Sequence, residues 1–213
     1  MNTHSISNIG ILGGTLDPIH IGHTIIAQAA LNELNLDKIL FMPSGNPPHK
    51  NINNITSNFH RKNMVELAIK SNDRFVFSDF EMKRTGIIYT SDTLKLLREH
   101  TNDNLFFIMG ADSLLAIESW HNPDEIFRYC TVLVADRDYQ YMQIKEHIAK
   151  LQAKYMARIE FVKSPVIGIS SSDIRNLVYK NKSIKYLVDD KVERYIICLL
   201  YTSPSPRDSC ASR

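Results

Sequence analysis

The sequence of 213 residues is poor in cysteine, with only Cys130, Cys198 and Cys210, widely spaced and without a CxxC pair. Such spacing excludes a disulfide framework and a cysteine-rich zinc module. No run approaches the roughly 18 apolar residues that a membrane span needs. The opening MNTHSISNIGIL has no basic segment followed by a long apolar one, so we expect no signal peptide. These absences predict a reduced, cytoplasmic protein.

An excess of charge of one sign is also lacking. The 25 Lys and Arg residues nearly balance the 23 Asp and Glu residues, giving a formal net charge of +2. A nucleic-acid-binding protein gathers its basic side chains in a patch or stripe, so we expect neither nucleic acid nor a membrane as a partner. A small anionic ligand needs only a local cluster and stays possible. The hydrophobic fraction of 44% is typical of a globular protein long enough to bury a core.

Short apolar runs alternate with segments of helical spacing along most of the chain. This alternation predicts an α/β fold, a Rossmann-like doubly wound parallel sheet with helices on both faces. A ligand should bind at the carboxyl ends of its strands, near the switch in strand order. Thr90 or Ser91 is a candidate N-cap of one helix, and the serines of SSSDIRNLV are candidate caps of another. The expected strands cover 9–12, 38–43, 74–80, 104–110, 130–135 and 158–162, and the expected helices begin or lie near 21, 64, 90, 141, 170 and 192.

Five unusual segments each follow directly after an expected strand, so all should lie on one rim of the sheet. Residues 44–58 also form a polar loop of a length that is usually functional or disordered. The five segments are GGTLDPIHIGH (13–23), PSGNPPHK (43–50), GADS (110–113), ADRD (135–138) and SPVIGISSS (164–172).

The C-terminal end has a different composition. YTSPSPRDSCASR, residues 201–213, is rich in Ser, Pro and Arg and has no periodicity, so we expect disorder. It is similar to a translated cloning adapter, and a genuine flexible tail is the alternative. We therefore predict one domain over 1–197 and a tail over 198–213.

The segment GGTLDPIHIGH combines features that suit a phosphate group. Gly13 and Gly14 allow the backbone to approach a ligand closely. His20 and His23, three residues apart at a helix start, point from one face, where the helix dipole attracts an anion. Gly22 between them leaves a flat place for a base or ribose.

Three other interpretations of this segment are possible. A zinc site needs a third ligand, such as Asp17 or His49, and more often has histidines at i and i+4. A dinucleotide-binding fingerprint needs G-x-G-x-x-G, which GILGGTLDP does not match. A plain structural turn would pack or cap with its histidines. The eleven-residue string as a whole favours a nucleotide site.

Two motifs together carry a family resemblance. HIGH after GGTLDPI resembles the H-x-G-H signature of the nucleotidyltransferase superfamily, shared with class I aminoacyl-tRNA synthetases, and GISSSDIR resembles its second signature, I-S-S-T-x-I-R. From about Asn8 to Ile197 the chain is similar to the bacterial nicotinate-nucleotide adenylyltransferases. The supporting strings are GGTLDPIHIGH, PPHK, YTSDTL, FIMGADSL, Trp120 followed by EIF, and ISSSDIR. Leu16, Ile88 and Ser172 depart from the usual Phe, Ser and Thr.

The resemblance implies that the 5′-phosphate of nicotinate mononucleotide attacks the α-phosphorus of ATP and that pyrophosphate leaves, in NAD biosynthesis. The nucleophile is already ionised, so catalysis should rest on positioning and charge stabilisation, with Mg²⁺ accompanying ATP. ATP and nicotinate mononucleotide are thus the expected partners, and a homo-oligomer is compatible with the sequence.

The resemblance also implies roles for individual residues. The catalytic set is His20, His23, Lys50 and Arg175. The ATP-binding set is Gly13, Gly14, Thr15, His20, Gly22, His23, Gly110, Asp112, Arg137, Ser171, Ser172 and Arg175. The nicotinate mononucleotide set is Asp17, Lys50, Tyr89, Thr90 and Trp120, and no residue is assigned to a metal.

Several of these residues have ordinary alternatives. Lys50 can be a solvated lysine, Asp112 a helix cap and Trp120 a core residue; the serines before Arg175 can simply cap a helix, and Arg61 is interpreted as a structural ion-pair former. The rival functions are adenylyl transfer to nicotinamide mononucleotide or phosphopantetheine, a non-catalytic nucleotide-binding module, and a metal hydrolase. PPHK and YTSDT argue against phosphopantetheine.

Overall fold

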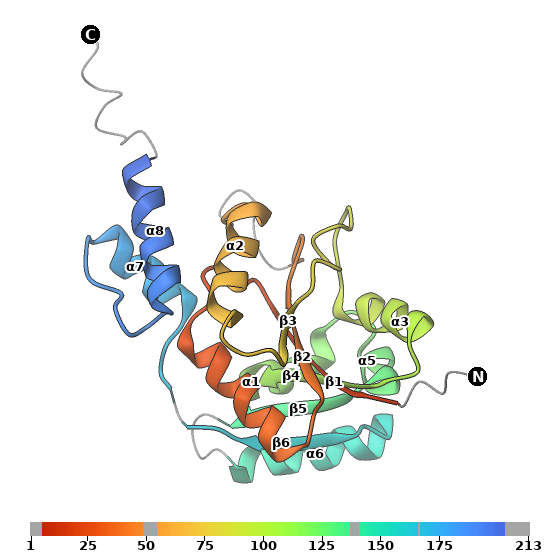
Figure 1. Cartoon of the computed structure of the whole chain (residues 1–213). Helices are drawn as coiled ribbons and strands as arrows, with labels where there is room; N and C mark the ends of the chain where they lie inside the picture. Colours follow the sequence, from red (N-terminus) through yellow and green to blue (C-terminus); the bar gives the residue numbers. More distant parts are fainter. Residues whose placement is uncertain (1–5, 49–54, 137–140, 166, 203–213) are drawn as a thin grey trace.

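The computed structural model describes residues 6–48, 55–136, 141–165 and 167–202, and its centre is a six-stranded parallel sheet (Figure 1). The strand order is β3-β2-β1-β4-β5-β6, which confirms the predicted fold class. The strands are β1 (Asn8–Gly14), β2 (Lys38–Pro43), β3 (Phe75–Phe77), β4 (Asn104–Gly110), β5 (Thr131–Asp136) and β6 (Ile159–Lys163). The helices are α1 (Ile21–Glu33), α2 (Asn58–Ile69), α3 (Thr90–His100), α4 (Ala111–Leu115), the 3-10 helix η2 (Ile117–Ser119), α5 (Pro123–Tyr129), α6 (Tyr141–Tyr155), α7 (Ser171–Tyr179) and α8 (Asp190–Thr202).

The switch in strand order lies between β1 and β4, which pair in parallel with Leu12 opposite Ile108. From β1 the chain turns one way to β2 and β3, and from β4 it turns the other way to β5 and β6. The loops that leave β1 and β4 therefore diverge and open a crevice at the carboxyl edge of the sheet. That crevice begins at Gly13, Gly14 and Gly110.

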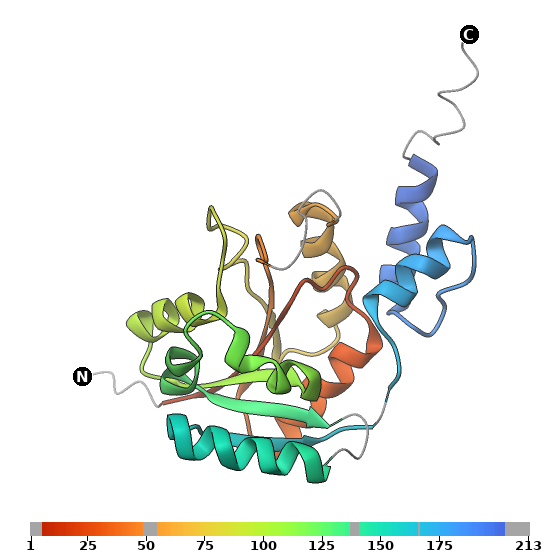
Figure 2. The same ribbon diagram turned by 180° about the vertical axis from the view of Figure 1, so that it is seen from behind.

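Two apolar cores cover the two faces of the sheet. One core is built on α1 and α2 with α7 and α8 at its margin, and the other on α3, α4, α5 and α6 (Figures 1 and 2). Strands buried on both faces explain the nearly continuous apolar runs of the sequence. In both views α7 and α8 stand beside the α2 side of the sheet. Tyr195 of α8 ties this part to α2, because its hydroxyl lies 2.8 Å from both His60 Nδ1 and Asn63 Nδ2.

The main differences from the expected elements concern β3, the N-cap of α3 and the segment after β4. β3 is shorter than 74–80 because this edge strand pairs with β2 at only three positions. α3 begins after Tyr89, so Thr90 and Ser91 lie inside its first turn and neither is the N-cap. α4, η2 and α5 were not expected. Ser170, in contrast, caps α7 as predicted, because its hydroxyl accepts a hydrogen bond from Asp173 N at 3.1 Å.

The C-terminal helix crosses the expected domain boundary. α8 extends to Thr202, five residues past position 197, while residues 203–213 lie outside the described part of the chain. The division into 1–197 and 198–213 stays a prediction. Among the described residues, none of the helices has the length and apolar character needed to cross a membrane.

Candidate active site

The loop after β1 brings the first motif to the crevice. Gly14 has a φ of +130°, a conformation that side chains rarely adopt, and Leu16 has a φ of +49°. Buried Arg61 of α2 donates from Nη1 to Thr15 O at 2.8 Å. Burial lowers the pKa of Arg61, and the negative charges of Asp17 and Glu81 oppose that shift.

Thr56 joins the segment that precedes α2 to this first motif. Its N–H donates to Asp17 Oδ2 at 3.1 Å, and its carbonyl accepts from Arg61 Nε at 3.0 Å. Arg61 therefore binds backbone carbonyls, and in the described structure it has no ion pair with a carboxylate, contrary to its interpretation as an ion-pair former. The segment 55–58 is fixed against residues 15–17 by these contacts.

The two motif histidines lie in contact at the start of α1. His20 is the N-cap residue, with extended backbone, and His23 is the third residue of the helix. His23 Nδ1 accepts a hydrogen bond from His20 N at 3.1 Å, and the ring centroids are 3.7 Å apart. His20 is buried, with 4% of its surface exposed, whereas His23 faces the crevice. The predicted paired placement of the two rings is confirmed.

Gly22 is required by the ring of His20. A Cβ at position 22 would lie 3.0 Å from His20 Nδ1 and 3.1 Å from His20 Cε1, closer than such contacts normally are. The glycine thus leaves room for the neighbouring imidazole. Its predicted contact with a base or ribose stays a prediction.

The second motif lies directly against the first. Ser171 Oγ donates to Pro18 O at 2.9 Å, and Arg175 donates from Nη1 to Asp17 O and from Nη2 to Ser172 Oγ at 3.2 Å. The N-terminus of α7 therefore begins beside the loop that carries His20. Because Arg175 is exposed, its guanidinium is accessible to an anion there.

A cavity of about 430 Å³ occupies the switch point between β1 and β4. It collects residues from the first motif, from 44–48, from 81–90 and from the segment after β4. Eight predicted site residues line it, which are Gly13, Gly14, Thr15, His23, Tyr89, Thr90, Gly110 and Trp120. Trp120 lines the cavity and also packs against the core, as its alternative interpretation expects, while its contact with a substrate stays a prediction.

Other predicted residues lie beside the cavity or outside the described structure. The buried Asp17 carboxylate accepts a hydrogen bond from Thr56 N, and the exposed Asp112 lies in the first turn of α4. Ser171, Ser172 and Arg175 lie at the α7 N-terminus. Lys50 and Arg137 fall outside the described residues. All ligand assignments stay predictions.

Several residues of the cavity wall were not predicted. His121 stacks on Tyr89 with ring centroids 4.1 Å apart. Glu81, from the turn after β3, accepts a hydrogen bond from Thr93 Oγ1 at 2.7 Å. Burial raises the pKa of Glu81 to about 7, opposed by the Thr93 hydrogen bond and by the charges of Arg84 and Arg61. The one signal in the sequence that could have indicated Glu81 is its position in DFEMKR, a polar segment at the end of an expected strand.

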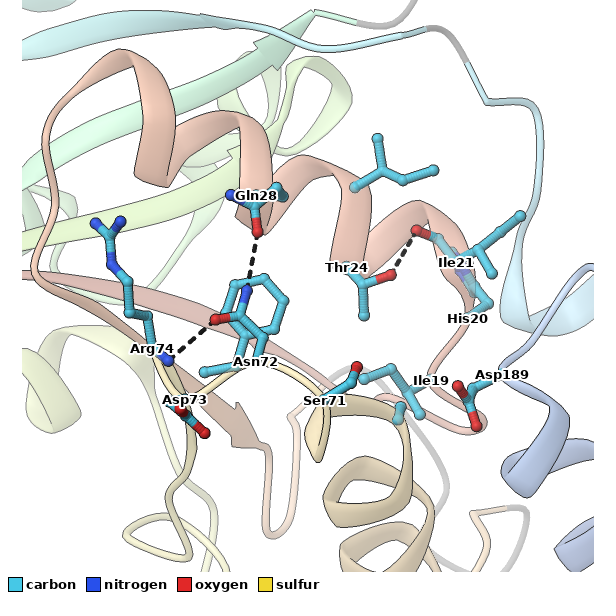
Figure 3. A pocket seen from close by; sticks show the side chains of 13 residues that line it. Ile19, His20, Ile21, Thr24, Gln28, Ser71, Asn72, Asp73, Arg74 and Asp189 are labelled. Carbon is cyan, nitrogen blue, oxygen red and sulfur yellow. Dashed lines mark hydrogen bonds between the residues drawn. The ribbon is translucent and has the colours of Figure 1, made fainter.

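A wider groove of about 740 Å³ lies along α1 (Figure 3). Polar side chains of the groove are already bonded within the protein: Asn72 Nδ2 donates to Gln28 Oε1 at 2.9 Å, and Thr24 Oγ1 donates to the backbone carbonyl of Ile21 at 3.0 Å. His20 reaches its edge near Asp189, but the glycines, the aromatic residues and His23 line the smaller cavity. We therefore place the site in the smaller cavity.

Comparisons with known proteins agree with this placement. Residues 11–177 match the cytidylyltransferase-like family. A protein of Caldicellulosiruptor bescii named "Probable nicotinate-nucleotide adenylyltransferase" is 41% identical over 188 residues, which cover 88% of this chain and 95% of that protein. A protein of the same name from Clostridium novyi is 42% identical, with 85% and 92% covered. The chain belongs to the nicotinate-nucleotide adenylyltransferase family.

Solved structures share the fold of this chain. The nicotinic acid mononucleotide adenylyltransferase of Plasmodium falciparum, solved with NaAD, superposes with a TM-score of 0.75 at 22% identity, over 91% of this chain and 96% of that one. A structure from Vibrio parahaemolyticus, named "Putative Nicotinate-nucleotide Adenylyltransferase", gives a TM-score of 0.65 at 19% identity, with 90% of this chain and 99% of that one covered. At these identities the likeness concerns the fold.

Within the described residues, no three His, Cys, Asp or Glu side chains come together as a metal site.

Proposed function

We propose that the chain transfers the adenylyl group of ATP to the 5′-phosphate of nicotinate mononucleotide, giving nicotinate adenine dinucleotide and pyrophosphate in NAD biosynthesis. The observation that carries this proposal is the meeting of both motifs beside one cavity. His20 and His23 lie against the loop to which Ser171 and Arg175 are bonded. The names of the relatives support the same acceptor.

The triphosphate is held at the end of the cavity that α1 lines, beside the N-terminus of α7. His23 faces the cavity, and His20 is in ring contact with it. The N-terminus of α7 and the Arg175 guanidinium add positive potential within the same region. We assign the histidines to the α- and β-phosphates, and Arg175 with Ser171 and Ser172 to the β- and γ-phosphates.

The pyridine ring lies at the other end, among aromatic side chains. Trp120 and the stacked pair of Tyr89 and His121 offer flat apolar surfaces for it. Thr90 begins α3, and the N–H groups and dipole of a helix start favour an anionic substituent such as a carboxylate. This arrangement supports nicotinate as the acceptor.

Catalysis is electrostatic. A phosphate oxygen of the acceptor forms a bond to the α-phosphorus while the bond from that phosphorus to the α,β-bridging oxygen breaks. Negative charge grows on the departing pyrophosphate, where the imidazoles and the guanidinium stabilise it. Mg²⁺ enters with ATP as part of the substrate, since it binds phosphate oxygens and water readily.

Pyrophosphate release from ATP and Mg²⁺ tests this function, with nicotinate mononucleotide, nicotinamide mononucleotide and phosphopantetheine compared in parallel. We expect a strong preference for nicotinate mononucleotide. His20→Ala should lower kcat by at least about 10²–10³ with the fold retained, while His100→Ala, at the far end of α3, should keep wild-type activity. A folded protein inactive with all three acceptors, or an active His20→Ala variant, would refute the proposal. A cytoplasmic location and any homo-oligomer stay predictions.

A further inference from the structure

Glu81 is an acidic residue in the wall of a cavity proposed to receive an anion. It lies in the turn between β3 and α3 and lines the cavity together with Ile88, Tyr89 and Thr90. An ionised carboxylate at this end would repel the carboxylate of nicotinate, so the charge of Glu81 bears directly on substrate choice. Among the described residues, Glu81 forms no ion pair that would neutralise it.

The contacts of Thr93 explain how Glu81 can be neutral. Thr93 Oγ1 lies 2.7 Å from Glu81 Oε1, 3.1 Å from Tyr89 O and 2.9 Å from Arg84 Nη1. The arginine only donates and the carbonyl only accepts, so an ionised Glu81 and Tyr89 O compete for the single hydroxyl hydrogen. A protonated Glu81 removes this competition, because its own hydrogen then fills the contact with Thr93.

The electrostatic surroundings of Glu81 are mixed. Burial raises its pKa to about 7; the Thr93 hydrogen bond and the positive charges of Arg84, on the same turn, and Arg61, on α2, lower it. His121 faces the same cavity from the segment after η2. Lys83, close in sequence, is exposed and paired with Asp79 at 2.9 Å. The charge of Glu81 therefore changes within the physiological pH range.

We infer that Glu81 determines specificity: its neutral form admits the nicotinate carboxylate, and its ionised form shifts the preference toward an uncharged pyridine substituent. This inference rests on the proposed function. For two charges about 7 Å apart at an effective dielectric constant near 40, repulsion lowers relative affinity about tenfold. The preference for nicotinate over nicotinamide mononucleotide should therefore fall about tenfold as pH rises through 7.

The test is the ratio of kcat/KM values for the two mononucleotides between pH 6 and 9, with dissociation constants from calorimetry as a second readout. The 5′-phosphate and His23 act on both substrates alike, so their titration cancels in the ratio. Glu81→Gln stays neutral and can still donate to Thr93. Its ratio should stay at the wild-type low-pH value throughout.

Two further variants separate Glu81 from its neighbours. Arg84→Gln removes a charge that lowers the pKa of Glu81, so the transition should move to higher pH, which a purely structural role would not cause. His121→Asn should leave the transition in place. A wild-type ratio that is flat with pH, a Glu81→Gln ratio that keeps its slope, or a transition lost in His121→Asn would overturn the inference. If neither mononucleotide binds or reacts, the proposed function itself fails.

Discussion

Replacing Gly22 by alanine adds one methyl group against the ring of His20. The new carbon would lie 3.0 Å from His20 Nδ1 and 3.1 Å from His20 Cε1. An unstrained contact between these atoms is about 3.5 Å, so the imidazole must shift by roughly 0.5 Å. It has little room, since it is 4% exposed and lies 3.7 Å from the ring of His23.

This substitution should move stability and activity differently. Alanine is favoured over glycine in a helix by up to about 1 kcal/mol, and an off-rotamer His20 costs about 0.5–1.5 kcal/mol. These effects nearly cancel, so Tm should change by only a few degrees. A misplacement of 1 Å can cost about a hundredfold in rate, so a shift about half as large should lower kcat roughly tenfold or more.

Steady-state pyrophosphate release together with thermal melting measures both quantities on the same protein. Asn32→Ala is the control in the same helix, because this exposed side chain lies near the C-terminal end of α1, far from His20. It should keep wild-type kcat. A Gly22→Ala enzyme with wild-type kcat would refute the steric account of Gly22, and one that fails to fold would show that position 22 supports the helix itself.

Other predictions follow from buried groups. Arg61→Met should lower the free energy of unfolding in urea by about 3–5 kcal/mol, because two backbone carbonyls lose a buried donor; exposed Lys62→Met should change it by less than about 0.5 kcal/mol. Glu81 binds a proton more tightly in the folded state, so its stabilising contribution is complete below pH 4.5 and is lost as pH rises to about 7. Urea unfolding at pH 5 and pH 8 tests this loss. The difference in the free energy of unfolding between Glu81→Gln and wild type should shift by up to about 3 kcal/mol in favour of the variant from pH 5 to pH 8, and a difference that is the same at both pH values would contradict this. A thiol reagent added to a chain ending at residue 202 should modify exposed Cys198 rapidly, and Cys130 only after unfolding, since burial raises the pKa of the Cys130 thiol to about 12; equal rates would refute the burial argument.

The fold could be predicted because most elements carry a clear periodic signal. β4 coincides with the expected 104–110, and α3 begins at residue 90, where a helix was expected. The segment 111–129 contains helices of one or two turns, which are too short to show a periodic pattern. The N-cap of α3 was missed for another reason: Ser91 has the right side chain for capping but lies fully buried within the helix.

The part of the site that could be predicted from the sequence is the part that belongs to the two motifs. His20, His23 and Arg175 belong to strings whose residue order is itself the signal. Glu81 and His121 belong to irregular segments without such a string, and only the packing of the turn after β3 and of the segment after η2 around one cavity brings them together. The hydrogen-bond competition at Thr93 needs distances that no pattern contains.

The contacts at residues 14–17 also make the neighbouring loop a module for protein engineering. At one end Ser44 N donates to Gly14 O at 2.8 Å, and at the other end Thr56 is held by Asp17 and Arg61. Residues 14–17 thus contribute to both attachment points, through the Gly14 carbonyl and the Asp17 side chain, and Arg61 of α2 adds to the second. A chimera that exchanges residues 49–54 for the corresponding segment of a relative changes neither the anchor residues nor the histidine pair, and so tests the predicted role of Lys50 by itself.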